Sequence, residues 1–248
     1  VFYWGGNVSL DVLQALRLPL MGVKPYAAGG AVQKLQDTAE NIAIVLKAFT
    51  EAQVLSFNEI IISDNNTLVI DASTFKKLDI NSHEASWTDT DGVDVKTSTG
   101  NNAAIKVTGT LDEFKTAGLI TSSNTFASEL NDNTNLVDQI TAYTISSTIS
   151  TDAEASAISN LVSNTPTGKT LTVSVDIASD YGTNGLSSSE FINLAKLDAA
   201  VSSNLIADNY PTGVNIVDSA DNIKTLITST DSAVIPAKDY IKGITSNT

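Results

Sequence analysis

Carboxylates stand at alternate positions around a glycine in the turn Asp89-Thr90-Asp91-Gly92-Val93-Asp94. Oxygen ligands at this spacing suit a hard cation such as calcium. The run lacks the closing Glu of an EF-hand loop, and acidic turns of this kind are more commonly solvated than metal-bound. The turn therefore has two interpretations: a calcium site with Asp89, Asp91 and Asp94 as ligands, or a solvated acidic turn.

Catalytic chemistry has few side chains to use. The single histidine, His83, stands in a polar segment beside Glu84, and the chain has no Gly-x-Ser-x-Gly elbow. The chain also has no cysteine, which removes disulfides, thiol nucleophiles and thiolate metal sites. Acid pairs for glycoside hydrolysis occur throughout the chain, and none stands out. We expect no enzymatic activity, and a hydrolase with an unrecognised acid pair stays open as an alternative.

The charge of the chain restricts its partners. Its 28 acidic residues exceed its 14 basic residues, which gives a net charge of -14. Nucleic acid and anionic membrane surfaces need a cationic face, so we expect neither as a partner. Arg17 is the single arginine, and a phosphate site built on bidentate guanidinium contacts is therefore not expected.

A short segment occurs twice, at residues 35–42 and 216–223. Both copies read Asp, Thr or Ser, Ala, an acid, Asn and Ile, and residues 149–158 form a looser third version. Asp37 and Asp218 are expected to cap helices, with Glu40 and Asp221 placed three residues on as in a capping box. Internal repetition of this kind predicts repeated strand-to-helix units.

Each copy is followed by apolar residues at helical spacing, which predicts one buried helix face each time. In the copy near the C-terminal end these residues are Ile223, Leu226 and Ile227. A second motif places an aromatic residue at the end of a first helical turn. Its aromatic residues, together with Phe49, are expected to pack in the core: Phe75, Phe114, Phe191 and Tyr240.

The pattern predicts an α+β fold of repeated strand-helix modules with short β-sheets and short amphipathic helices, elongated in shape. Strands are expected at 58–64, 67–71, 104–108, 141–146 and 170–177, and a long helix from 188 to about 203. Asn65-Asn66 tolerates left-handed conformations and predicts a hairpin between the first two strands. The Ser/Thr/Asn-rich stretch 121–135 divides the chain into modules at 32–135 and 136–248.

Residues 1–31 differ from the rest of the chain. The segment is strongly apolar, but Asp11, Arg17 and Pro19 interrupt it, so it is expected neither to span a membrane nor to act as a signal peptide. It is interpreted either as a short helix at 10–16 packed on its own domain or as an arm that packs on a neighbouring subunit. The contacts of such an arm would be Phe2, Tyr3, Trp4, Leu10, Leu13, Leu16 and Leu20.

Aromatic residues in loop-like contexts are candidates for contact with a glycan or another protein. The four candidates are Trp4, Trp87, Tyr181 and Tyr210, which have Gly, Pro, Asp or Thr as neighbours.

Residues 32–80 and 214–244 carry a family resemblance. A helix opened by Asp-Thr-Ala-x-x-Ile, an Ile-Ile-Ile-Ser-Asp strand, and a Thr-Leu-x-Ile strand leading to a cap and Phe follow one another. This order resembles the repeats of large secreted bacterial surface proteins of the hemolysin-type, S-layer-like and giant-adhesin groups. The resemblance implies an exported structural or adhesive role, often with calcium. The chain departs from those repeats because it lacks their glycine-rich nonapeptides.

Together these observations predict a self-assembling, non-catalytic subunit of an extracellular surface layer, filament or adhesin at the cell surface. Its expected partners are other copies of itself, and glycans or cell-surface polysaccharide. Calcium is the one cofactor that the sequence suggests. The alternative is a carbohydrate- or ligand-binding module of a secreted protein.

Overall fold

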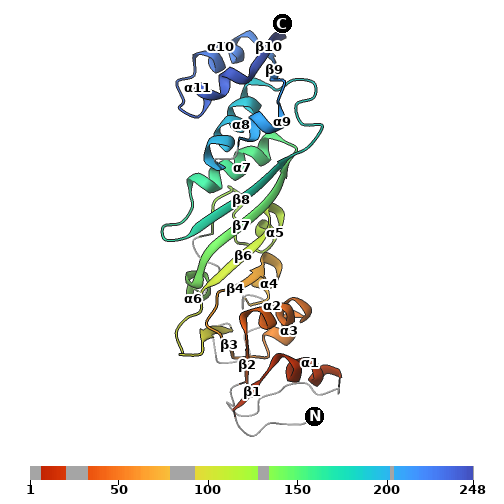
Figure 1. The fold of residues 1–248 in the computed structure, drawn as a ribbon, viewed down its shortest axis with the longest axis vertical. Coiled ribbons are helices and arrows are strands. Elements are labelled where there is room, and N and C mark those ends of the chain that lie inside the picture. The colour runs from red at the N-terminus through yellow and green to blue at the C-terminus, as the bar shows by residue number, and fades with distance from the viewer. Residues whose placement is uncertain (1–6, 21–32, 79–92, 128–133, 202–203, 248) are drawn as a thin grey trace. The chain divides into compact units, whose positions relative to one another are not determined.

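A computed structural model describes residues 7–20, 33–78, 93–127, 134–201 and 204–247 (Figure 1). Short helices and short parallel sheets make up the chain, which confirms the α+β prediction. The chain divides into two compact units. Unit 1 comprises residues 1–121, 127–144 and 167–170, and unit 2 comprises 122–126, 145–166 and 171–248. Two of the five crossings between the units, after residues 121 and 126, lie within the predicted boundary at 121–135.

Unit 1 holds most of the first half of the chain. Its elements are β1 (Val8–Leu10), α1 (Val12–Leu20), β2 (Gln33–Asp37), α2 (Ala39–Ala48), α3 (Glu51–Val54), β3 (Glu59–Ile62), β4 (Leu68–Asp71), α4 (Ala72–Lys76), β5 (Asp94–Thr97), β6 (Ile105–Thr110), α5 (Leu111–Thr116), α6 (Thr134–Gln139) and the first half of β7 (Ile140–Ile149).

The first sheet has the strand order β1-β2-β3-β5, and all its pairs are parallel. Leu10 pairs with Leu35, Leu35 with Ile60, and Ile60 with Val95, so one apolar line crosses the sheet. Leu35, Ile60 and Val95 have no exposed surface. Parallel neighbours need crossover connections, and α1 and α2 occupy the first two of them.

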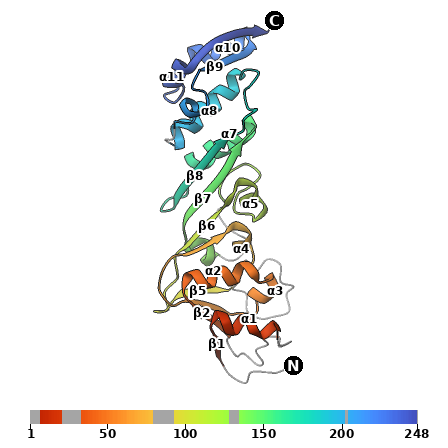
Figure 2. The ribbon, with the colours of Figure 1, turned by 45° about the vertical axis from the view of Figure 1, so that its right-hand side comes forward.

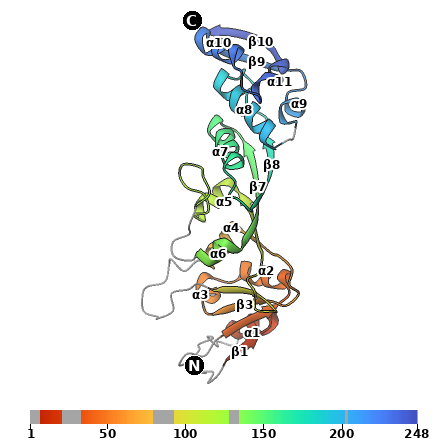
Figure 3. The ribbon, with the colours of Figure 1, turned by 90° about the vertical axis from the view of Figure 1, so that its left-hand side faces the viewer.

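The second sheet has the order β4-β6-β7-β8, where β8 is Thr170–Ile177. Strands β7 and β8 lie side by side (Figure 3). Residues 140–144 of β7 belong to unit 1 and residues 145–149 to unit 2. The predicted hairpin between β3 and β4 is wrong, because the two strands belong to different sheets. Asn65 does adopt the left-handed conformation, with a φ of 56°. It turns the chain from one parallel sheet to the next instead of closing a hairpin.

Unit 2 contains the second half of β7 and the remaining elements: α7 (Asp152–Ser163), most of β8, α8 (Ser188–Val201), α9 (Leu205–Asn209), β9 (Val214–Ser219), α10 (Ala220–Thr228), α11 (Val234–Ala237), η1 (Lys238–Tyr240) and β10 (Ile241–Asn247). Helices α7 and α8 pack together. Strands β9 and β10 form a parallel pair with α10 beside them (Figure 2). A single parallel bridge joins Leu186, just before α8, to Ile216 of β9.

The aromatic core predictions are confirmed at four of five positions. Phe49 is buried, and Phe75, Phe114 and Phe191 have no exposed surface. Tyr240 is exposed, because it lies in the short 3-10 helix η1 instead of on a packed helix face. In the part of the chain that the structure describes, no helix has the length and apolar character needed to cross a membrane.

Candidate functional site

One carboxylate serves the starts of two helices in unit 1. Asp37 lies at the end of β2, and its Oδ1 accepts hydrogen bonds from the Thr38 amide and the Asn41 side chain, both at 2.8 Å. Its Oδ2 accepts from the amide of Val12, the first residue of α1, at 3.2 Å. The Thr38 hydroxyl in turn caps α2 by accepting from the Asn41 amide at 3.4 Å. We call Asp37 with these three donors the first aspartate clamp.

The same arrangement occurs in unit 2. Asp218 Oδ1 accepts from the Ser219 amide at 2.7 Å and the Asn222 side chain at 2.9 Å. Its Oδ2 accepts from the amide of Ser188, the first residue of α8, at 2.9 Å. The Ser219 hydroxyl caps α10 by accepting from the Asn222 amide at 3.3 Å. These residues form the second aspartate clamp.

The strand register of the two clamps is also the same. Leu10 pairs with Leu35, and Leu186 pairs with Ile216. In each case the helix starts two residues after the first partner, and the Asp follows two residues after the second. The predicted equivalence of the two helix starts is therefore confirmed. The predicted capping residue is wrong by one position: Thr38 and Ser219 are the N-caps, and each Asp precedes its cap.

The looser third version of the motif differs from the clamps. Helix α7 is capped by Thr151, whose side chain accepts from the Glu154 amide while Glu154 bonds the Thr151 amide, a capping box. Asp152 is the first helical residue instead of the cap. Its carboxylate accepts a hydrogen bond from the Asn193 side chain at 2.7 Å. Residues 149–158 therefore share a helix start with the other two copies but not the clamp.

In unit 1, a second carboxylate binds the start of the next helix, α2. Asp64 stands two residues after Ile62, which pairs with Asp37. Its Oδ1 accepts from the amide of Ala39, the first residue of α2, at 3.2 Å. Helices α1 and α2 thus each receive a carboxylate, from the end of β2 for α1 and from the turn after β3 for α2. This places negative charge where the helix dipole is positive.

A lysine side chain caps the C-terminal end of α2, and another caps that of α10. Lys77 Nζ donates to the carbonyl oxygens of Leu46, Lys47 and Phe49 at the end of α2, at 2.8 to 3.1 Å. Lys238 Nζ donates to those of Ile227 and Ser229 at the end of α10, both at 2.8 Å. A cation at a helix C-terminus satisfies carbonyl groups that lack helical partners.

The clamps hold their carboxylates ionised. Burial raises the pKa of Asp37, but hydrogen bonds from Asn41, Thr38 and Val12 lower it by more than burial raises it. The pKa of Asp37 therefore lies below its ordinary value. Hydrogen bonds from Asn222, Ser188 and Ser219 lower the pKa of Asp218 to about 2. Carboxylates that accept several N–H groups are good helix anchors. Their oxygens are occupied by donors within the protein, so the chemistry of the clamps is structural.

The predicted calcium turn is not brought together in the described part of the chain. Asp89 and Asp91 lie outside the described residues, and Asp94 begins β5. The Asp94 carboxylate forms an ion pair with Lys96 at 2.8 Å. Among the described residues, no three His, Cys, Asp or Glu side chains gather as a metal site would require.

The predicted surface aromatics have different positions. Tyr181 is buried, which contradicts its expected surface contact. Tyr210 is half-buried, and its hydroxyl donates to the Tyr181 carbonyl oxygen at 2.9 Å. Trp87 lies outside the described residues. Tyr181 and Tyr210 therefore tie two loops of unit 2 together.

The segment predicted as an arm is partly built into unit 1. Strand β1 pairs with β2, and Leu10 is buried there. Leu13 is 65% exposed on α1, and Leu16 is half-buried. Leu20 ends α1 and its side chain is not described, whereas Phe2, Tyr3 and Trp4 lie outside the described residues. The described part of the segment is thus packed within unit 1 and is not a free arm. Among the predicted contacts whose side chains are described, Leu13 has the largest exposed fraction.

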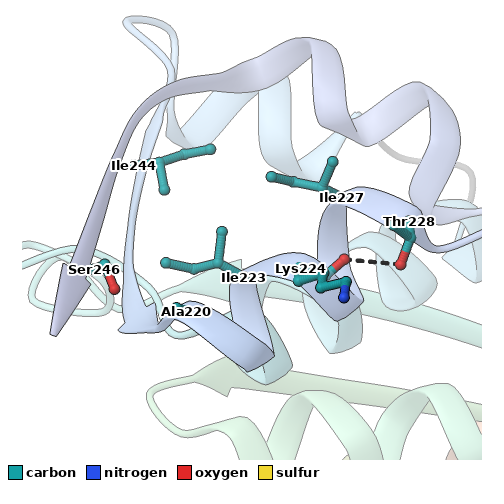
Figure 4. Close-up of a pocket in the computed structure, with 7 residues that line it drawn as sticks. All are labelled: Ala220, Ile223, Lys224, Ile227, Thr228, Ile244 and Ser246. Atoms are coloured by element: carbon teal, nitrogen blue, oxygen red, sulfur yellow. Dashed lines mark hydrogen bonds between the residues drawn. The ribbon is translucent and has the colours of Figure 1, made fainter. Parts of the chain in front are cut away.

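Unit 2 has an exposed apolar groove that the sequence did not reveal. It has a volume of about 380 Å³ and runs between α10 and β10 (Figure 4). Ile227 is 51% exposed and Ile244 is 48% exposed. Helical spacing predicted Ile227 as a buried residue, which is wrong. The residues that line the groove are Ala220, Ile223, Lys224, Ile227, Thr228, Ile244 and Ser246.

Comparisons of the chain with protein-family models, with curated proteins and with solved structures found no match.

Proposed function

We propose that the protein is a self-assembling, non-catalytic subunit of an extracellular surface layer, filament or adhesin. The observation that carries this proposal is the groove between α10 and β10, where apolar side chains lie open at the end of a parallel strand pair. Strand edges with exposed apolar residues pair readily with another chain. A protein that retains such an edge is suited to assembly.

The internal construction of the units supports the same proposal. Unit 1 stacks parallel strands in one register, and Asp37 and Asp64 each bind the start of a preceding helix, α1 and α2 respectively. Unit 2 uses Asp218 in the same way. A strand-helix arrangement that stacks on itself within a chain has the geometry to continue between chains. The resemblance to bacterial surface-protein repeats supports an extracellular place for the assembly.

The charge of the chain determines how assembly should respond to solution conditions. Two copies with a net charge of -14 repel each other at low ionic strength. Salt screens that repulsion. We therefore expect association to strengthen with salt, and a stronger response to calcium than to the same ionic strength of sodium would indicate a specific ion site.

Sedimentation velocity tests this proposal. The 248-residue chain should form larger species as its concentration and the salt concentration rise. A chain that stays monomeric under all these conditions would contradict the proposal. Retention of that monomer on a polysaccharide column would favour the alternative of a glycan-binding module, together with the glycan partners predicted for it.

A further inference from the structure

The two units differ in how they cover equivalent apolar positions. The sequence separation from Asp218 to Ile227 equals that from Asp37 to Leu46, so Ile227 and Leu46 are equivalent. Ile244 and Ile60 are also equivalent, because Ile244 pairs with Ile216 and Ile60 pairs with Leu35. Leu46 and Ile60 have no exposed surface, whereas Ile227 and Ile244 are about half exposed. These two equivalent positions are thus covered in unit 1 and open in unit 2.

Unit 1 shows what makes the difference. Strand β5 pairs in parallel with the outer edge of β3, where Val95 lies beside Ile60. Strand β4 packs against α2, the helix that carries Leu46. In unit 2, β10 pairs with β9, and within the described residues no strand pairs with its other edge. A cover like that of unit 1 would therefore be a parallel strand with an apolar residue beside Ile244.

Strand β1 has the properties of that cover. It stands at the other end of the strand order β1-β2-β3-β5, and no described strand pairs with its outer edge. It presents Leu10 to the apolar line that continues through Leu35, Ile60 and Val95. Helix α1 follows directly and exposes Leu13, which could cover Ile227 as the helices of unit 1 cover one another. Within the described residues, β1 is the first strand in the order of its sheet and β10 is the outer strand of its pair, so a parallel sheet could continue from β10 to β1.

The β10 strand itself carries no acidic residue. Residues 241–247 contain Lys242 and no acid, and the groove contains Lys224, although the chain as a whole is strongly acidic. Asp11 follows β1 directly and is exposed. The β10 edge therefore brings no carboxylate of its own to the approaching Asp11, although Asp218 pairs with Ser246 and Asp221 lies in the first turn of α10.

We propose that the β10 edge and its groove bind β1 and α1 of a second copy of this chain, with β1 parallel to β10 and Leu10 beside Ile244. The contact adds a strand to a sheet edge and joins unlike surfaces, so each copy keeps a free β1 or β10 edge for the next copy. The inference rests on the proposed function and identifies the surfaces that perform it.

A charge in the groove tests the contact. Ile244→Asp should weaken association at least about tenfold, because it places a charge in a desolvated interface. The matched control is Ile44→Asp, which changes an isoleucine on α2 that is 59% exposed and should leave association unchanged. Circular dichroism must show that both variants keep the fold. Unchanged association of Ile244→Asp, or an equal loss of association in both variants, would overturn the proposal.

Cross-linking tests the register, and the absence of native cysteine keeps it free of background. Ser9→Cys in one chain and Thr245→Cys in another should join through a short bismaleimide, since the proposed register places these positions near each other. The control mixture contains Ser9→Cys and Thr99→Cys, where Thr99 is an exposed position in unit 1. These two chains should not cross-link. Cross-links between two Thr245→Cys chains would show an antiparallel pairing of like edges and overturn the proposal. Association without the expected cross-link removes this inference but not the proposed function, whereas a monomeric chain removes both.

Discussion

The first aspartate clamp predicts an effect of one side chain on two helices. Asp37→Ala removes the acceptor of the Val12 amide at the start of α1 and of the Thr38 amide and Asn41 side chain at the start of α2. The freed amides are partly exposed, so water replaces the lost acceptor and the loss stays moderate. Both helices also lose a negative charge at their positive dipole ends.

The magnitude follows from these two contributions. An N-terminal capping interaction contributes about 1 kcal/mol, and the charge at each helix start adds about 0.3 to 1 kcal/mol. We therefore expect Asp37→Ala to lower the free energy of unfolding of unit 1 by about 2 kcal/mol. Glu40→Ala is the matched control, because Glu40 is an exposed acid in the first turn of the same helix. At moderate salt it should change the free energy of unfolding by about 0.5 kcal/mol or less.

Urea unfolding followed by circular dichroism measures the loss, and hydrogen exchange locates it. The amides of α1 and α2 should both exchange faster in Asp37→Ala, although the substituted residue lies in neither helix. A double-mutant cycle with Asn41→Ala should give a coupling energy of about 0.5 to 1 kcal/mol, since the two side chains share a hydrogen bond. Faster exchange confined to α2, or a loss no larger than that of Glu40→Ala, would refute the clamp.

The remaining predictions concern acid and the helix C-terminus. The pKa of Asp218 is lowered to about 2 from 3.8, so its contribution to stability is present above pH 3.8 and is lost as the pH falls towards 2. Asp218→Asn should therefore make unit 2 less stable at neutral pH and flatten its acid unfolding curve between these values, and an unchanged curve would contradict the assignment. Lys77→Met should destabilise unit 1 by about 1 to 2 kcal/mol, because it removes three donations to carbonyl groups at the end of α2. Thermal unfolding compared with the exposed control Lys115→Met should detect it, and equal melting of the two variants would show that the cap contributes nothing.

Local features of the fold could be predicted from the sequence. The strand at 170–177 has the bounds of β8, because strict alternation over eight residues leaves little choice. The equivalence of Asp37 and Asp218 followed from the shared spacing of a hydroxyl residue, Ala, an acid, Asn and Ile after each Asp. The identity of the cap did not, since Asp and Thr or Ser are both good caps and stand side by side. Only the strand register shows that the Asp reaches back to the previous helix.

Features that depend on distant partners could not be predicted. Asn65-Asn66 between two apolar strands has the pattern of a hairpin, but whether the second strand pairs with the first is a property of the sheet and not of the turn. Helical spacing places Ile227 on the apolar face of α10, but it does not say whether anything covers that face. Tyr181 stands beside Asp and Gly as loop residues do, and its burial depends on tertiary packing that these neighbours do not indicate. The groove was missed for the same reason.

Electron microscopy of the assembled chain tests the central claim most directly. Material grown at high protein and salt concentration should show copies joined head to tail, with β1 of one copy placed on β10 of the next. The Ile244→Asp chain should show only separate particles under the same conditions. Assemblies joined through other surfaces would contradict the proposed contact, and separate particles of the unsubstituted chain under every condition would contradict the assembly function itself.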